Sequence, residues 1–170
     1  MRRNSTQHSG FTLIELLAAI VVMSVISATI MPVIASASDS YVVARQVRST
    51  TEHAAFALDR VTRITRQAPI GANDSGVDVT SALSSAIEFG DGTGVQLLGT
   101  TLEMLVPGEN AVPLCFDVES FTIEYLGDDG VTNTAQTPEL TQRFAYSIVV
   151  DGVTLKVLAL PRIWIGQEAP

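Results

Sequence analysis

Glu15 is the only formally charged side chain between Arg3 and Asp39, and it lies near the start of a long apolar run. A carboxylate in an apolar environment tends either to take up a proton or to pair with a cation. In the first turn of a helix it is also favoured by the helix dipole. The chemistry suggested by Glu15 is therefore pairing with a positive group. The alternative is a tolerated glutamate near a helix end that reaches toward a membrane interface.

The apolar run that contains Glu15 covers residues 11–35. As a helix at about 1.5 Å per residue it would be roughly 37 Å long, which exceeds the ~30 Å hydrocarbon core of a bilayer. A secretory signal peptide would explain Arg2, Arg3 and the small residues at 35–37, but its apolar region is typically only about 7–15 residues long. A plain transmembrane anchor would explain the length but not Glu15, because a charge deep in a bilayer is costly.

A third interpretation rests on the sequence GFTLIELL at residues 10–17. This run resembles the N-terminal cleavage and methylation motif of type IV pilins and type II secretion pseudopilins. The resemblance implies a leader at residues 1–10, removed by a prepilin peptidase after Gly10, and methylation of the new amino terminus on Phe11. Glycine at the cleaved position would let the peptidase approach the backbone closely. Within the family, Glu15 would neutralise the terminal amine of a neighbouring subunit as the helices stack.

The same resemblance implies partners and a location. The partners would be the other pilins or pseudopilins of a filament, an inner-membrane assembly platform and the lipid bilayer. The chain would cross the bacterial inner membrane once, with its C-terminal domain outside the cytoplasm. Beyond residue 68 the likeness is loose, and it points to minor pseudopilins of the J class and related minor pilins.

The periodicity of apolar residues predicts one long helix over residues 11–68, with its first half, 11–35, in lipid or a filament core. Its second half, 36–68, is amphipathic. The apolar stripe there comprises Val43, Val47, Thr50, Ala54, Leu58, Val61, Ile64 and Ala68. Pro32, which lies where many family members also carry proline, either kinks the helix or ends it near residue 31. Pro69 and Gly71 stop the helix.

A β-rich domain is predicted over residues 69–170, after a loop at 69–82. Short apolar or alternating runs predict strands at 86–89, 95–98, 102–106, 112–118, 121–126, 143–150 and 153–160. Asp151-Gly152 between the last two is a strong hairpin signal. The predicted fold is α+β and pilin-like: a long N-terminal helix packed on a C-terminal antiparallel β-sheet.

Residues typical of catalysis or metal binding form no recognisable pattern. Of the two histidines, His8 lies in the expected leader and His53 on the helix, and no phosphate-binding or zinc-protease motif occurs. Cys115 lies in an apolar run, which indicates a buried thiol. The acidic loop residues, Asp74, Asp78, Asp91, Asp128 and Asp129, lack EF-hand spacing. We therefore expect neither an enzyme nor a cofactor or metal site.

The charge distribution also excludes one class of partner. Residues 69–170 contain three basic and fourteen acidic side chains, a net charge of −11, whereas residues 39–68 have a net charge of +2. An acidic domain would repel phosphate backbones, so we expect no nucleic-acid binding. The sequence thus predicts a structural filament subunit. The alternative is a membrane-anchored or secreted extracytoplasmic binding domain with no filament role.

Overall fold

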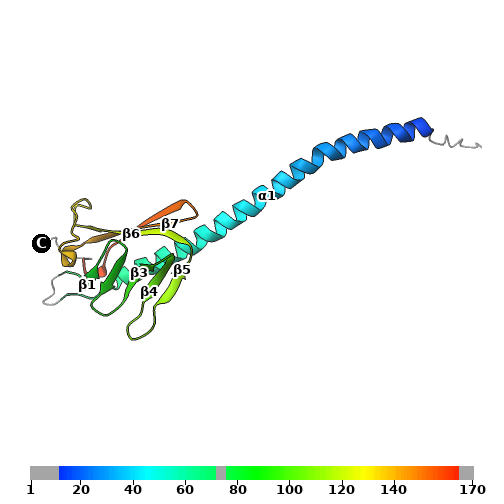
Figure 1. Cartoon of the computed structure of the whole chain (residues 1–170). Helices are drawn as coiled ribbons and strands as arrows, with labels where there is room; N and C mark the ends of the chain where they lie inside the picture. The colour runs from blue at the N-terminus through cyan, green and yellow to red at the C-terminus, as the bar shows by residue number, and fades with distance from the viewer. Residues whose placement is uncertain (1–11, 72–75, 165–170) are drawn as a thin grey trace, which may run out of the picture. The chain divides into compact units, whose positions relative to one another are not determined.

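The computed structural model describes residues 12–71 and 76–164. The chain divides into two compact units, Met1–Gln46 and Val47–Pro170. A single helix, α1, spans Leu13–Arg66 and so contributes residues to both units (Figure 1). The β-strands all belong to the second unit.

The ends of α1 follow from local sequence. Glu15 lies in the first turn, and Arg63 and Arg66 lie in the last turn. At these ends a negative and a positive charge, respectively, interact favourably with the helix dipole. Pro69 disfavours helical geometry in the residue before it, so the helix cannot continue far. The predicted helix over 11–68 is confirmed for the described residues to within two positions at its C-terminal end.

The buried face of α1 is shorter than the predicted stripe. Burial begins at Ala54 and continues through Leu58 and Val61, with Ala68 just beyond the helix. The expectation that the covered stripe starts at Val43 is wrong, because that side chain is 61% exposed. Apolar periodicity identifies the apolar face of a helix, but it does not show how far a partner element covers that face.

The first sheet has the strand order β1-β2-β3-β4-β5, and all its pairings are antiparallel. Its strands are β1 (Val79–Ala82), β2 (Ala86–Phe89), β3 (Gly94–Leu98), β4 (Thr101–Leu105) and β5 (Val112–Cys115). Each strand therefore pairs with its neighbour in sequence. The predicted loop over 69–82 is wrong at its end, because β1 forms there by pairing with β2.

The predicted strand over 112–118 is also corrected. β5 ends at Cys115, and Asp117 adopts a left-handed backbone conformation with φ of 57°. Aspartate tolerates this conformation better than most residues. The chain turns there, and Phe116 is left 63% exposed instead of continuing the alternation.

The second sheet has the order β6-β7-β8 and comprises β6 (Val118–Leu126), β7 (Arg143–Val150) and β8 (Val153–Ala159). Short 3-10 helices, η2 at Pro138–Leu140 and η3 at Arg162–Trp164, precede β7 and follow β8. The Asp151-Gly152 hairpin is confirmed, with φ of 50° and 70° at the two turn residues. Positive φ at both positions is typical of a type I′ turn, one of the two favoured two-residue hairpin turns.

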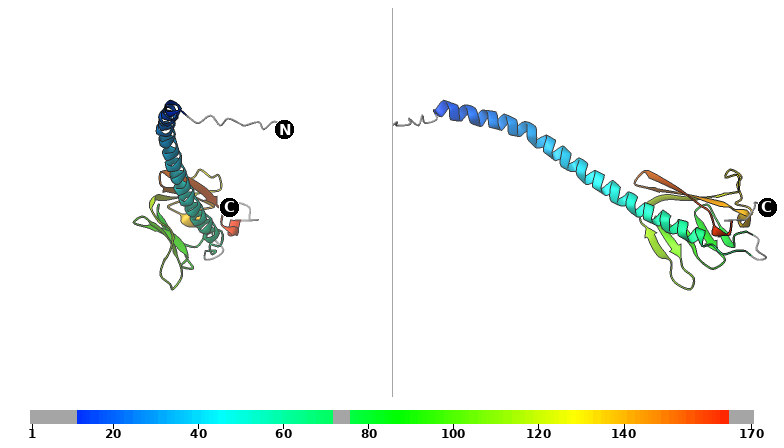
Figure 2. Two further views of the ribbon diagram at one scale, coloured as in Figure 1. Left: turned by 90° about the vertical axis from the view of Figure 1, so that its right-hand side faces the viewer. Right: turned by 180° about the vertical axis from the view of Figure 1, so that it is seen from behind.

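The core of the second unit lies where α1 meets both sheets. Figure 2 shows the last turns of α1 running between the two sheets, and buried residues from all three form one cluster. Alternate residues of β6 and β7, among them Phe121, Tyr125, Phe144 and Tyr146, are buried, as the alternation in these predicted strands requires. The α+β, pilin-like architecture is thus confirmed, although two antiparallel sheets replace the single expected one.

A buried hydrogen bond joins the helix to the second sheet. The hydroxyls of Thr65 and Tyr146 lie 2.6 Å apart, and the Thr65 hydroxyl also donates to the Val61 carbonyl at 3.0 Å. The Tyr146 hydroxyl is therefore the donor in the pair. Burial raises the pKa of Tyr146, so the phenol stays protonated and can keep this role.

We expect Thr65→Val to destabilise the second unit by about 1–3 kcal/mol, because it leaves the buried Tyr146 hydroxyl without an acceptor. Tyr146→Phe should cost less, about 0.5–1.5 kcal/mol, since Thr65 still donates to Val61. Adding Tyr146→Phe to Thr65→Val should recover part of the loss. Urea unfolding of residues 36–170, followed by circular dichroism, measures all three. Simple additivity of the two single losses would contradict the shared hydrogen bond.

The extent of helix burial predicts where the chain can be shortened. Fragments starting at residue 36 and at residue 47 should unfold with the same midpoint, because residues 36–46 lie outside the compact second unit. A fragment starting at residue 69 should aggregate or lose cooperative unfolding. It lacks Leu58 and Val61, whose burial contributes roughly 1.5–3 kcal/mol each. Equal stability of all three fragments would show that α1 does not complete the core.

Candidate functional site

The N-terminal end of α1 is closed by a reciprocal pair of residues. The backbone N–H and the hydroxyl of Thr12 both donate to Oε2 of Glu15 at 2.9 Å, and the Glu15 N–H donates to the Thr12 hydroxyl oxygen at 3.3 Å. This is the geometry of a capping box, in which each residue satisfies an otherwise unpaired N–H of the other. The Glu15 carboxylate consequently points back toward the residues that precede the helix.

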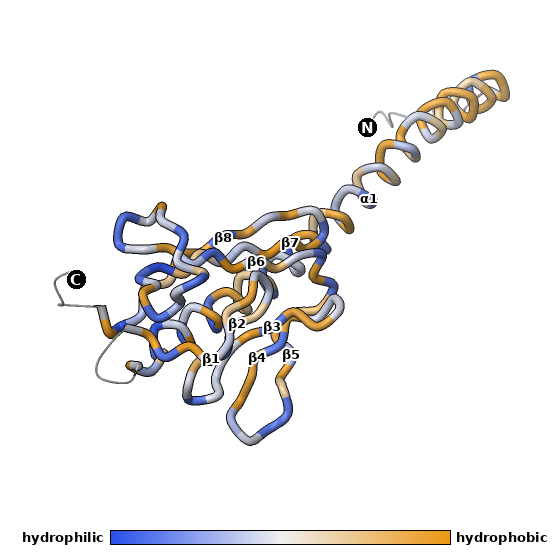
Figure 3. The backbone as a smooth tube through the Cα atoms, turned by 60° about the vertical axis from the view of Figure 1, so that its left-hand side comes forward, coloured by the Kyte–Doolittle hydropathy of each residue, from blue (hydrophilic) through white to orange (hydrophobic). Residues whose placement is uncertain are grey.

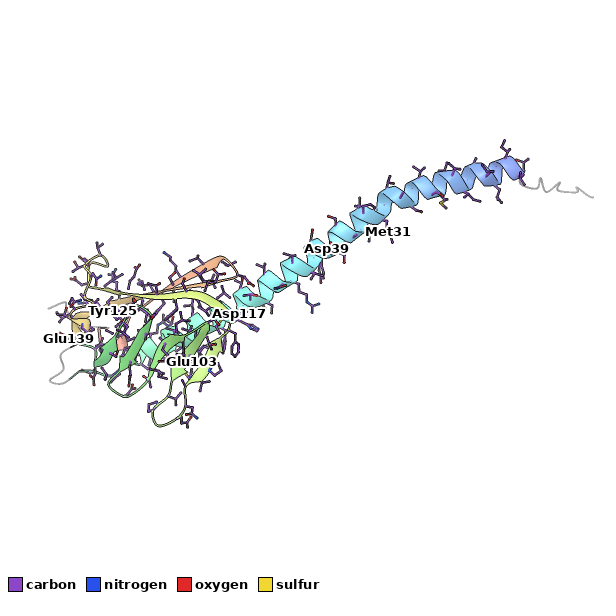
Figure 4. The ribbon with its side chains drawn as sticks, in the orientation of Figure 1. Met31, Asp39, Glu103, Asp117, Tyr125 and Glu139 are labelled. Atoms are coloured by element: carbon purple, nitrogen blue, oxygen red, sulfur yellow. The ribbon has the colours of Figure 1, made fainter. Side chains whose placement is uncertain are left out.

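The described part of the first unit is exposed along its whole length and is largely apolar up to residue 38. Every residue from 12 to 49 is exposed, including large side chains such as Leu13, Ile14 and Met31. The tube in Figure 3 is hydrophobic along this half of α1. Beyond Glu15, the next charged residue is Asp39, which Figure 4 labels together with Met31. Among the described residues, α1 is the one helix long and apolar enough to cross a membrane by length and composition.

Hydroxyl groups within this apolar segment bond back to the helix itself. Ser24 donates to the Ile20 carbonyl at 2.7 Å, and Thr29 donates to the carbonyls of Val25 and Ile26. Such bonds satisfy the hydroxyl donors without water, as a lipid or filament core requires.

Pro32 lies inside α1, which continues for more than thirty residues beyond it. The alternative in which the helix ends near residue 31 is therefore wrong. The kink at Pro32 stays a prediction. Proline removes one backbone hydrogen bond and crowds the preceding turn, so a local bend is its usual effect inside a helix.

Comparison with known protein families matches residues 6–31 to the prokaryotic N-terminal methylation motif. The match includes Gly10, Phe11 and Glu15. The chain carries a prepilin-type N-terminal motif. The match stops before Pro32, and comparison with curated proteins finds no match. The J-class likeness of the β-rich domain thus stays a prediction.

The structure places only part of the predicted site. Gly10 and Phe11 lie outside the described residues, so the distance from the future amine to Glu15 is not defined. Thr12, which sequence reasoning missed, proves to be the direct partner of Glu15. The signal was present in the sequence, because a threonine three positions before a glutamate at the start of an apolar run is the pattern of a capping box.

The described residues of the second unit contain no candidate metal site, because no group of three or more His, Cys, Asp or Glu side chains lies close enough together to hold an ion. His53 is exposed on α1, and Cys115 is buried as predicted, with a pKa raised by burial and by the charge of Asp117. Asp129 is satisfied within its own loop. Hydrogen bonds from the Thr132 hydroxyl and from the N–H groups of Val131 and Thr132 lower its pKa to about 2.

The motif predicts how the chain is processed. The mature protein should begin at methylated Phe11, measured by mass spectrometry of the chain purified from its membrane. Gly10→Arg should block leader removal, because a long charged side chain replaces a hydrogen at the cleaved bond. Ser9→Arg is the matched control, since it adds the same charge and leaves Gly10 in place. A mature chain starting at Ser38 would indicate a signal peptide, and retention of Met1 in the unmodified chain would indicate a plain anchor.

Proposed function

We propose that this chain is a structural subunit, a minor pilin or pseudopilin, of a type IV pilus or a type II secretion pseudopilus. Prepilin peptidase removes the leader, residues 1–10, and methylates Phe11. Residues 11–35 then hold the chain in the inner membrane and later form part of the filament core. Residues 36–68 link this segment to the extracytoplasmic β-rich domain, residues 69–170. The prepilin-type motif is a feature of structural subunits rather than of enzymes, which supports a non-catalytic role.

The observation that carries this proposal is the way Glu15 is held. Its Oε2 accepts both bonds from Thr12, whereas its Oε1 receives no hydrogen bond from the described residues. One oxygen therefore fixes the side chain, and the other remains available to a cation. The terminal amine of a neighbouring subunit would be such a cation, and pairing with it would set the register between stacked helices.

The uncovered apolar surface of residues 13–38 supports the same conclusion. An exposed helix of this kind needs lipid around it before assembly and other helices around it afterwards. A buried charge pair then discriminates between registers, because a misaligned subunit leaves both charges unpaired in an apolar medium. A plain anchored binding domain would also need lipid, but in it Glu15 would serve only as the helix cap, with no cation for its Oε1.

Three substitutions separate the charge of Glu15 from its capping role. Glu15→Gln keeps a side-chain oxygen for the cap and removes the charge. Glu15→Leu removes both, and Thr12→Val removes the capping hydroxyl but keeps the charge. If the charge pairs with a neighbour's amine, Glu15→Gln and Glu15→Leu should both reduce filament incorporation at least tenfold. Thr12→Val should then reduce incorporation far less.

Incorporation is measured by cysteine cross-linking between subunits and in sheared-filament fractions, with leader removal and membrane insertion followed on the same samples. All three variants should be cleaved and inserted, so a loss of incorporation is not a loss of processing. Normal incorporation of Glu15→Gln would reject charge pairing. A severe defect in Thr12→Val, with Glu15→Gln normal, would instead assign the requirement to the helix cap.

A further inference from the structure

The core-facing side of β4 is fully covered only as far as Met104. Side chains alternate between the two faces of a strand, so Leu102 and Met104 lie on the same face of β4. Leu102 is completely buried in the core, whereas Met104 is only half-buried. The packing of the core therefore ends at the side chain of Met104.

A pocket of about 160 Å³ opens at this point. Arg60, Ile64 and Gln67 line it from α1, and Met104 lines it from β4. A water molecule needs only about 10–15 Å³ of such a cavity, so the pocket has room for several molecules of that size. A small polar solute can therefore reach the thioether of Met104, although this residue lies on the core-facing side of its strand.

A cation is already in contact with the sulfur. The Nε–H of Arg60 donates to the sulfur of Met104 at 3.4 Å. Within the described ranges, 12–71 and 76–164, Arg60 forms no ion pair. A guanidinium carries several N–H donors, and a thioether is only a weak acceptor for one of them. The contact thus leaves Arg60 with donor capacity that a stronger acceptor on the same sulfur could use.

Oxidation of the sulfur would supply that acceptor. In the reaction with hydrogen peroxide, a sulfur lone pair attacks one peroxide oxygen, the O–O bond breaks, and the other oxygen leaves as water with both protons. The sulfur loses two electrons and the peroxide gains them, so the thioether becomes a sulfoxide. The new oxygen is a strong acceptor, and hydrogen bonds to it from a guanidinium are strengthened by the positive charge.

We propose that Met104 is an oxidation site at which the second unit consumes hydrogen peroxide, and that Arg60 binds the sulfoxide oxygen so that the fold survives. Oxidation of a methionine usually disrupts a core, because an apolar side chain becomes polar. At Met104 the polar product has a cationic donor beside it and a pocket around it. The proposal concerns the second unit alone and does not rest on the filament role.

The first test treats the purified full-length chain, in detergent micelles, with hydrogen peroxide. The methionines of the sequence are Met1, Met23, Met31 and Met104, and mass spectrometry of peptides assigns each added oxygen to one of them. We expect one added oxygen on Met104 in the folded chain. If Met104 gained oxygen only after unfolding in urea, the pocket would not admit peroxide and the proposal would be overturned.

The second test measures the part played by Arg60. Thermal unfolding is followed before and after peroxide treatment by near-ultraviolet circular dichroism, which reports the buried aromatic residues of the second unit. Oxidation should move the midpoint of the unsubstituted chain by less than about 2 °C. In Arg60→Leu it should lower the midpoint by at least about 5 °C, because the sulfoxide oxygen loses its donor. Arg66→Leu is the matched control, since it removes an exposed charge outside the pocket, and it should behave as the unsubstituted chain.

Met104→Leu controls for oxidation at other residues, such as Cys115. Combined with Arg60→Leu, it should abolish the shift that peroxide causes, because no sulfur remains at position 104. A shift that persists in this double variant would belong to another residue and would overturn the proposal. Equal shifts with and without Arg60 would overturn the binding of the sulfoxide by Arg60. None of these results bears on the Glu15 variants, by which the filament role is judged.

Discussion

One helix in this protein has to suit two different surroundings, and most of the structure follows from that constraint. From residue 12 to residue 49 nothing in the described chain covers α1, whereas from Ala54 onward one face of the helix is part of the core. A uniformly apolar helix would be insoluble in its second half. A helix that was amphipathic along its whole length would place charged side chains in its first half, where an apolar environment cannot solvate them. The helix sequence changes from almost uncharged to regularly charged near Asp39.

Polar groups are handled differently in the two halves for the same reason. In the first unit the polar side chains of Ser24 and Thr29 bond to the helix that carries them, and Glu15 bonds to Thr12. Such local bonds would survive the transfer from lipid to a filament core that we propose, because they need no outside partner. In the second unit the Thr65–Tyr146 pair links elements far apart in sequence and fixes the helix on the sheet. The remaining oxygen of Glu15 is the exception, because it accepts no hydrogen bond from the described residues, and the pairing that we propose with a neighbouring amine would satisfy it.

Strong local signals made the helix, the terminal hairpin and the inward residues of β6 and β7 predictable. Period-two alternation defines Phe144, Tyr146 and Ile148, and Asp151-Gly152 fixes the turn after them. β1 was not predictable, because its sequence VTSA is short and largely polar and becomes a strand only by pairing with β2. The length of buried helix and the division into two sheets depend on distant contacts in the same way. The Thr12–Glu15 capping box follows from a local sequence pattern, whereas the Thr65–Tyr146 hydrogen bond depends on packing between segments far apart in the chain.

The edges of the sheets bear on how copies of this chain can associate. β5 is an edge strand that contains Pro113, which cannot donate a backbone hydrogen bond, and β8 is an edge strand with Lys156 exposed at its centre. The free side of β6 is partly occupied, since the N–H groups of Val118 and Ile123 donate to carbonyls in the turns of the first sheet. Three of the four sheet edges are therefore unsuited to strand addition. Contacts between copies that add no strand would use side-chain surfaces, and α1 provides a distinctive one: an exposed apolar first half with a single carboxylate at its start.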